Sequence, residues 1–486
     1  MIRRILPILV LLAVIVAAPL LLRRDTEVAL SEEGADRLVV VTPHNESIRR
    51  EFGEAFAAHW KAKTGRPLFI DWRSPAGGGE ILRVLDAAFS AAKDLGKEGT
   101  EYDIFFGGGE KDFRKQADLG RLAKLEVFSR HPEWFADTAV PAEFTGQTFY
   151  DADHRWVGVC VSQFGILYNT DALAWIDVAP PTRWDDLRDP AYFGRLALAD
   201  PTMSSSVMQS FEMMIQEQMQ KVLREQGDSP EARQKGWENG MMLILNMGAN
   251  ARYFSDSSSK IPHDVALGDA AAGTTIDFYG RTMEEIVAHD GHSRLKWIAP
   301  SGGTPVSVDP VGVFRGAPHG EVAQEFVEFC LSEAGQVLWN QRAGSPGGPQ
   351  AQALRRLPVR RDLYTPDRLQ RFSDPDAMPF ERAGEFVYQP ELTGAAFNAL
   401  RIIIKSMCIA PHEELKRAWE ARVVKGGEEP ASLFVLGEIR YETVMKEWVP
   451  LVKGGDKIAI SRKTTDLSRH FKEQYEAIAA GKEVRP

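Results

Sequence analysis

The sequence predicts an α/β fold, because short apolar runs alternate with polar turns and with segments of helical periodicity. The first run, residues 38–41, is a continuous aliphatic stretch of the kind found in parallel strands that are covered on both faces. A polar turn follows it, and apolar side chains then recur every four residues between 48 and 60, which predicts an amphipathic helix. Similar runs at 68–72, 102–106 and 196–199 are each followed by a turn rich in Gly, Ser or Pro.

The polar turns after these strands are candidate ligand-binding loops. In open α/β sheets, ligands bind beyond the carboxyl ends of the strands, and the N-terminus of a following helix favours an anion. In the first turn, either Asn45 or Ser47 can cap the next helix. The residues of these turns that we expect to contact a ligand are His44, Asn45, Ser74, Gly77, Gly78, Gly108, Ser204, Ser205 and Ser206.

Length and composition restrict the classes of function. A chain of 486 residues is long enough for two or more domains, and 44% hydrophobic residues are ordinary for a globular protein. The formal charge of -10 argues against a nucleic-acid partner. The sequence contains no HExxH, Walker A or dinucleotide-binding motif, and Ser345 lacks the spacing of a nucleophile elbow. We therefore expect neither an enzyme nor a cofactor.

The N-terminus predicts export. Residues 5–22 are apolar and uncharged, between two pairs of arginines. As a helix this segment would span about 27 Å, close to the bilayer core of about 30 Å. We expect an uncleaved anchor in the inner membrane and a periplasmic or extracytoplasmic body; cleavage after Ala18, as in a signal peptide, is the alternative. Residues 25–36 form a polar linker.

The three cysteines predict no metal or redox site. Cys160, Cys330 and Cys408 are widely spaced, and each has apolar neighbours. This pattern is typical of buried free thiols.

Further along the chain, residues 156–169 form a long extended run broken by glycines, which could carry the chain from one lobe to another. Helices are predicted around 207–223 and 236–247, and apolar strands at 296–299 and 311–314 form a return path.

The last part of the chain is predicted to be mostly helical. An amphipathic helix is expected over 321–339. Beyond residue 366, Phe397, Leu400, Ile404 and Met407 form one apolar stripe, and a second stripe runs over 433–452. We expect these helices to pack on the lobes.

Six stretches, in order, resemble the type 2 periplasmic solute-binding proteins of ABC importers, in particular the group that includes ferric-iron-binding proteins. The similarity extends over roughly residues 37–365. The stretches are VVTPHNE at 40–46, YDIFF at 102–106 with QADLGRL at 116–122, WDDLRDPAYFGRLALADP at 184–201, LGDAAAGTTIDFY at 267–279, DPVGVFRGAPH at 309–319 and LPVR at 357–360.

This resemblance implies two α/β lobes that close on a solute by hinge motion. Lobe 1 would comprise residues 37–155 and 300–365, lobe 2 residues 156–299, and residues 366–486 would form a helical extension. The resemblance also implies a monomeric binding protein that delivers its solute to an ABC permease in the membrane.

The resemblance leaves the solute open. Ferric-binding relatives use a His, a carboxylate and two adjacent Tyr; His44 and Tyr279 fall at matching positions, but Gly280 replaces the second Tyr. The loop that would carry the carboxylate is glycine-rich and offers N–H donors. We therefore expect an anionic or phosphate-bearing solute, with Asp277 and Tyr279 also in the site. The alternatives are a ferric or other metal ion held by His44 and Tyr279, or a membrane-tethered ligand sensor.

Overall fold

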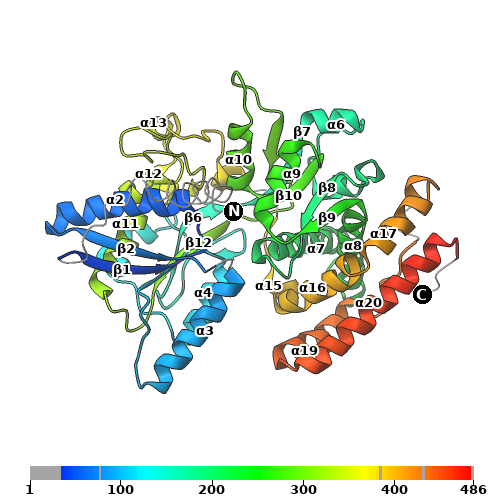
Figure 1. Cartoon of the computed structure of the whole chain (residues 1–486), viewed down its shortest axis with the longest axis horizontal. Helices are drawn as coiled ribbons and strands as arrows, with labels where there is room; N and C mark the ends of the chain where they lie inside the picture. Colours follow the sequence, from blue (N-terminus) through cyan, green and yellow to red (C-terminus); the bar gives the residue numbers. More distant parts are fainter. Residues whose placement is uncertain (1–33, 76–77, 383–385, 429–432, 483–486) are drawn as a thin grey trace, which may run out of the picture.

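The computed structural model describes residues 34–75, 78–382, 386–428 and 433–482. It consists of two α/β lobes, each built on one mixed β-sheet, and a set of C-terminal helices, of which those from residue 390 onward lie against the second lobe (Figure 1). This architecture confirms the predicted two-lobed α/β class with a helical C-terminal extension. The predicted anchor at 5–22 and linker residues up to 33 lie outside the described residues.

The first sheet has six strands in the order β13-β6-β12-β3-β1-β2. β1 is parallel to both β2 and β3, whereas β12 is antiparallel to β3 and β6. The carboxyl ends of β1, β2 and β3 therefore lie at one edge, as the sequence predicted. The strands are β1 (Asp36–Val41), β2 (Leu68–Arg73), β3 (Ile104–Phe106), β6 (Val157–Ser162), β12 (Ser307–Val313) and β13 (Leu357–Pro358), with a separate hairpin of β4 (Glu143–Phe144) and β5 (Gln147–Thr148).

Helices of the first lobe cover both faces of this sheet (Figure 1). Asn45 caps the first of them, since its side chain accepts a hydrogen bond from the Ile48 amide at 3.1 Å, and Gly65 ends it with φ 76°. The helices are α2 (Glu46–Thr64), α3 (Gly78–Asp94), α4 (Glu110–Asp118), α5 (Val127–Arg130), α11 (Gly320–Leu331) and α12 (Glu333–Leu338). The single helix expected over 321–339 is thus wrong, because the Ser332 side chain caps a new helix through the Gly335 amide.

The second sheet has the order β11-β7-β10-β8-β9, with β8 parallel to β9 and β10. Its strands are β7 (Phe164–Asn169), β8 (Leu196–Ala199), β9 (Ala251–Ser255), β10 (Ala272–Ile276) and β11 (Leu295–Ile298). Its helices are α6 (Thr170–Trp175), α7 (Ser205–Gln226), α8 (Pro230–Asn250), α9 (Ile261–Leu267) and α10 (Asp277–Ile286).

The extended run at 156–169 splits between the two sheets. β6 pairs with β12 and β13 of the first sheet, and β7 pairs with β10 and β11 of the second. The chain therefore changes lobe at Gln163, seven residues later than the boundary at 156 that we expected. The hydrophobic periodicity and the composition of this run could not reveal where the chain passes from one lobe to the other, since both strands are equally apolar.

From residue 390 onward the C-terminal extension shares one hydrophobic core with the second lobe, whereas Phe380 before it packs on the core of the first lobe. Leu400, Ile403 and Trp419 are fully buried in the cluster that also contains Trp237 of α8. The extension comprises α13 (Pro366–Leu369), α14 (Pro379–Arg382), α15 (Pro390–Thr393), α16 (Phe397–Ile404), α17 (His412–Trp419), α18 (Tyr441–Thr443), α19 (Val449–Gly454) and α20 (Lys457–Ala479). Within the predicted stripe 433–452, helix begins only at Tyr441.

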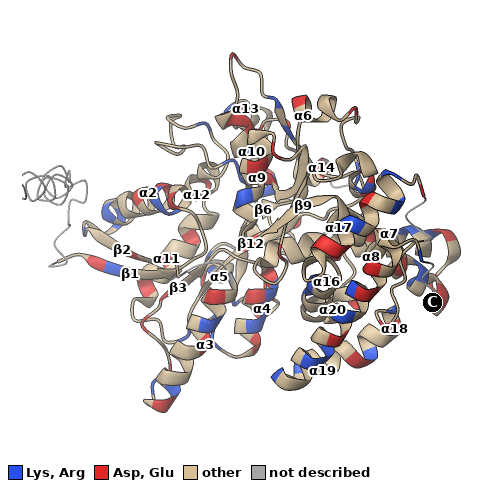
Figure 2. Cartoon of the chain, turned by 45° about the vertical axis from the view of Figure 1, so that its right-hand side comes forward, with Lys and Arg blue, Asp and Glu red and all other residues tan. Residues whose placement is uncertain are grey.

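Two smaller expectations can be compared with the structure. The three cysteines are free and buried, as predicted. In the part of the chain that the structure describes, the segment Pro390–Ile409 is long and apolar enough to cross a membrane, but 56% of its most apolar part is buried against the protein, as in a core helix. Acidic and basic side chains are interspersed over the helices of both lobes and of the extension (Figure 2).

Candidate ligand-binding site

Two of the predicted loops meet at one buried carboxylate, that of Asp309 on β12. His44, after β1, places its Nε2 atom 3.2 Å from Asp309 Oδ2. The amide of Gly108, after β3, donates a hydrogen bond to Asp309 Oδ1. The carboxyl edge of the first sheet is therefore a polar site, although the residue at its centre comes from an antiparallel strand.

A buried guanidinium joins this carboxylate to the second lobe. Arg356, just before β13, donates from Nη1 to Asp309 and from Nη2 to Ser162 Oγ at 2.7 Å. It also lies over the ring of Phe278 from α10, 4.5 Å from the ring centroid. The Arg356 side chain is only 3% exposed, and its Nε atom has no hydrogen-bond partner among the described residues.

The electrostatics of this cluster follow from burial and pairing. Arg356 and the hydrogen bonds from His44 and Gly108 hold the pKa of Asp309 well below its usual range, despite the burial that opposes ionisation. Burial lowers the pKa of His44, so this imidazole is neutral at pH 7. Gly107 has φ 86°, and a Cβ there would lie 2.4 Å from the His44 ring, so a side chain at this position would displace the histidine.

The second lobe contributes Asp277 and Tyr279 from the first turn of α10. The buried Asp277 carboxylate accepts hydrogen bonds from the amides of Gln163 at 3.2 Å and Phe278 at 2.8 Å. Tyr279 is partly buried beside Phe278, and burial raises the pKa of its phenol. Because Gln163 is the point at which the chain changes lobe, this hydrogen bond connects Asp277, in the first turn of α10, to the crossover between the lobes.

Substituting Asp277→Asn should flatten the dependence of stability on pH. Burial raises the pKa of Asp277 to about 6, against the opposing effect of Arg281 and Arg356. At pH values between the usual pKa of an aspartate and about 6, the folded state binds more protons than the unfolded state. The free energy of unfolding therefore falls as the pH rises through this range. The variant cannot ionise, and at pH 7 it should be more stable by about 1–2 kcal/mol. Urea unfolding at pH 4 to 7 checks this; an unchanged pH slope would contradict it.

The start of α7 forms the other polar edge. Ser204 caps the helix through the Val207 amide at 3.4 Å and lies 3.0 Å from the hydroxyl of Ser206. The Ser205 hydroxyl accepts a hydrogen bond of 2.7 Å from Arg401 of α16. The three predicted serines are thus together, at the carboxyl end of β8.

The remaining predicted residues do not belong to this cluster, or, in the case of Gly77, are not among the described residues. Asn45 is exposed and serves as the cap of α2, and Ser74 is exposed beyond the end of β2. Gly78 is the first residue of α3, and Gly77 lies outside the described residues.

The sequence prediction missed Ser162, Asp309, Arg356 and Arg401. An Asp within the apolar run 306–313, and an Arg within Leu354–Leu357, were signals of buried polar partners, since such residues are rarely buried unpaired. Nothing in the local sequence indicated which carboxylate and which guanidinium would meet.

The donor set does not match a ferric site closely. Among the described residues there is no group of three or more His, Cys, Asp and Glu side chains that could hold a metal ion. A Cβ at Gly280 would lie 2.3 Å from Trp297 Cδ1, so the packing excludes the second tyrosine of ferric-binding relatives. Nε2 of His44 already faces Asp309.

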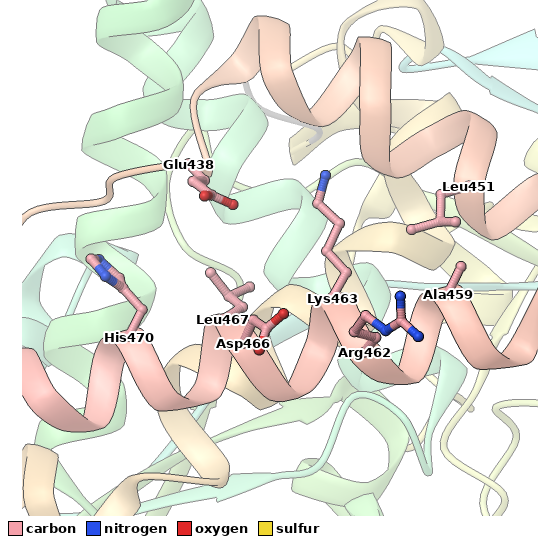
Figure 3. A pocket seen from close by; sticks show the side chains of 8 residues that line it. All are labelled: Glu438, Leu451, Ala459, Arg462, Lys463, Asp466, Leu467 and His470. Carbon is pink, nitrogen blue, oxygen red and sulfur yellow. The ribbon is translucent and has the colours of Figure 1, made fainter.

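A separate hollow of about 430 Å³ lies on the extension, between α20 and the segments before it (Figure 3). Glu438, Lys463 and His470 are among the residues that line it, and none of the predicted site residues does. It therefore belongs to the packing of the extension and not to the site between the lobes.

The structure has two α/β lobes that are connected at Gln163, and polar loops of both lobes converge between them. This architecture is that of a two-lobed solute-binding protein. The chain belongs to the bacterial extracellular solute-binding protein family, whose sequence model matches residues 102–368, more than half of the 486 residues. Members of this family bind solutes rather than catalyse reactions and work outside the cytoplasm, so the body of the chain is extracytoplasmic.

Known relatives and structures agree with this assignment. The chain is 28% identical over 182 residues to the phosphoglycerate transport regulatory protein PgtC of Salmonella typhimurium, a match that covers 37% of this chain and spans only 40% of the length of PgtC. Iron-bound HitA of Pseudomonas aeruginosa has a TM-score of 0.51 at 18% identity, with 76% of this chain and 99% of HitA covered. The substrate-binding protein of an Agrobacterium tumefaciens ABC transporter reaches 0.54 at 16% identity, with 77% and 95% covered. At such identities these structures show the fold alone.

Proposed function

We propose that the chain is the solute-binding component of an ABC-type importer. It captures a small anionic organic solute, of the phosphate-bearing class, between its lobes and delivers it to a permease in the membrane. The relative PgtC is named for phosphoglycerate transport, and phosphoglycerate is such a solute.

The observation that carries this proposal is the set of hydrogen-bond donors at the two helix starts where the loops meet. The loop at Gly108 leads into α4, whose N-cap Gly109 offers no side-chain acceptor to the first amides of the helix, and the start of α7 supplies serine hydroxyls and the amides of a second helix N-terminus. Arg356 lies behind the Gly108 loop, where its guanidinium is shared with Asp309 and Ser162. Such groups bind phosphate and carboxylate oxygens. A ferric ion requires the opposite, a set of anionic oxygen donors.

Within this site we assign two kinds of role. Tyr279 and the serines at 204–206 contact the solute, together with the amides around Gly108. His44 is a positioning residue, because its buried ring lies against Asp309 and holds that carboxylate beside Arg356.

A ligand sensor is the second candidate function. PgtC is named a regulatory protein, and the predicted anchor at 5–22 would hold the body of the chain at the inner membrane. The proposal includes a membrane anchor at residues 5–22 and a monomeric state, and it retains the predicted domain boundaries except the one that the structure places at Gln163. Membrane fractionation tests the anchor, and light scattering tests the monomeric state.

The direct test uses the full chain, purified without chelator, in native mass spectrometry combined with metal analysis. We expect a metal-free protein that carries a small organic or phosphate mass, or that gains one on addition of 3-phosphoglycerate. A stoichiometric iron atom would overturn the anion proposal in favour of the ferric alternative. A rise of the melting temperature with 3-phosphoglycerate but not with ferric citrate gives an independent check, since a ligand that binds only the folded state stabilises it.

The double variant Tyr279→Phe/Ser205→Ala should bind the solute about 10-fold more weakly, because two hydroxyl hydrogen bonds are lost at about 1 kcal/mol each or less. The change removes one oxygen from each side chain and should leave the unfolding transition in place. Isothermal titration with 3-phosphoglycerate measures it. Tyr253→Phe is the matched control, since this exposed tyrosine of the same lobe bonds Asp264 and not the site. An unchanged affinity of the double variant would refute the assigned contacts.

A further inference from the structure

The C-terminal extension brings a cation to the start of α7. Helix α16 places Arg401 so that its Nη2 atom donates to Ser205 Oγ at 2.7 Å. The guanidinium also lies over the ring of Phe397, 5.1 Å from the centroid, which fixes its orientation. Both contacts direct Arg401 to the loop that follows β8, where the site serines lie.

Arg401 has no direct ion pair. Among the described residues its electrostatic partner is the carboxylate of Asp112, with no salt bridge between the two, and its Nε atom is buried without a hydrogen-bond partner. By contrast Lys405, one turn later, pairs with Asp200 at 2.8 Å, and Arg356 pairs with Asp309. A partly buried cation without a direct ion pair is incompletely compensated, and an anionic ligand would complete its pairing.

The groups opposite Arg401 come from the first lobe. Helix α4 approaches α16, as Lys111 lies 3.8 Å from the centroid of the Phe397 ring (Figure 1). The Asp112 carboxylate, in the first turn of α4, lies against Gly108 and Gly109 and interacts electrostatically with Arg401. Burial raises the pKa of Asp112, and Arg401 and the hydrogen bond from the Gly109 backbone oppose that rise.

We infer that Arg401 binds the anionic group of the solute, between the first turn of α7 and the loop at Gly108, so that the extension completes the binding site. This inference rests on the proposed function. Arg401 lies outside residues 102–368, the part that matches the family, so the contribution is made by the extension of this chain. It gives the extension a role in solute binding besides its packing on the second lobe.

The test compares the affinity of the full chain for 3-phosphoglycerate by isothermal titration in three variants. Arg401→Met should raise the Kd about 10- to 100-fold, since a hydrogen-bonded charge is removed. Arg401→Lys keeps the charge but not the planar donor pair, and should fall between Arg401→Met and the wild type. Arg417→Met is the control, because Arg417 is an exposed arginine of the same extension, paired with Glu414 on α17; its Kd should be that of the wild type.

The outcomes separate the two proposals. If the wild type binds 3-phosphoglycerate and Arg401→Met binds it within 2-fold, the role of Arg401 is refuted while the proposed function stands. If the wild type binds neither 3-phosphoglycerate nor inorganic phosphate, both are refuted. If Arg401→Met does not fold, the affinity of Arg401→Lys is the test instead. A Kd of Arg401→Lys for 3-phosphoglycerate that equals the wild-type Kd at both 50 and 200 mM salt would refute the inference.

Discussion

Substituting Arg356→Met should lower the free energy of unfolding by about 3–5 kcal/mol, the cost of removing one partner of a buried ion pair. The variant leaves the Asp309 carboxylate buried with only His44 and the Gly108 amide as partners. Asp309 is 9% exposed in its side chain, so water cannot replace the guanidinium. Urea unfolding at pH 7 measures the loss. A cost below about 1 kcal/mol, as for exposed pairs, would show that the cluster is open to solvent.

The double variant Arg356→Met/Asp309→Asn is the control for this interpretation. Its neutral amide still accepts a hydrogen bond from Gly108 but carries no buried charge, so it should recover a large part of the loss. The pH dependence gives a second check. Because the folded pKa of Asp309 is depressed, its contribution to stability is present above the usual carboxyl pKa and is lost as the pH falls below about 4. That acid loss should be absent from both variants.

The first strand-loop-helix unit shows how much the sequence could predict. The run at 38–41 and the stripe from Ile48 to Trp60 appear in the structure as β1 and α2, and of the two predicted caps, Asn45 and Ser47, Asn45 is the one used. These features are local, since each depends on the periodicity and the cap of one segment. The sequence also predicted that the turns after β1 and β3 would meet, because parallel strands end at the same edge.

The centre of the site could not be predicted in the same way. Asp309 and Arg356 are 47 residues apart, and His44 is 265 residues from Asp309. Their meeting depends on the antiparallel pairing of β12 with β3 and β6, which no local pattern fixes. The same holds for Arg401, which reaches Ser205 only because the stripe of α16 is buried against the second lobe.

The extension also links the two lobes beside the hinge. The amide of Tyr388 donates to the carbonyl of Thr145, in the β4–β5 hairpin, at 2.9 Å. The Tyr388 hydroxyl donates to Glu212 of α7 at 2.8 Å. Tyr388 of the extension thus forms hydrogen bonds with both lobes. A direct ion pair between the lobes involves the same Glu212 side chain.

That ion pair joins Lys111 of α4 to Glu212, at 2.7 Å, and Lys111→Met should lower the free energy of unfolding by about 3 kcal/mol. Glu212 is fully buried, and in the variant it would keep only the hydroxyls of Tyr388 and Thr393 as donors. We expect the low end of the range for buried pairs, because Lys111 is one-third exposed and water can partly replace it. Urea unfolding measures the stability, and titration with 3-phosphoglycerate should show a weaker affinity, since the lobes lose a contact that holds them together.

Lys115→Met is the matched control for this prediction. Lys115 lies on the same helix, but its ion pair with Asp86, at 3.5 Å, is about half exposed, and its loss should cost less than about 0.5 kcal/mol. The double variant Lys111→Met/Glu212→Gln separates charge from packing, because a neutral amide still accepts from Tyr388 and Thr393. If the double variant is as unstable as Lys111→Met, the lysine acts through its cation–π contact with the Phe397 ring rather than through the buried carboxylate.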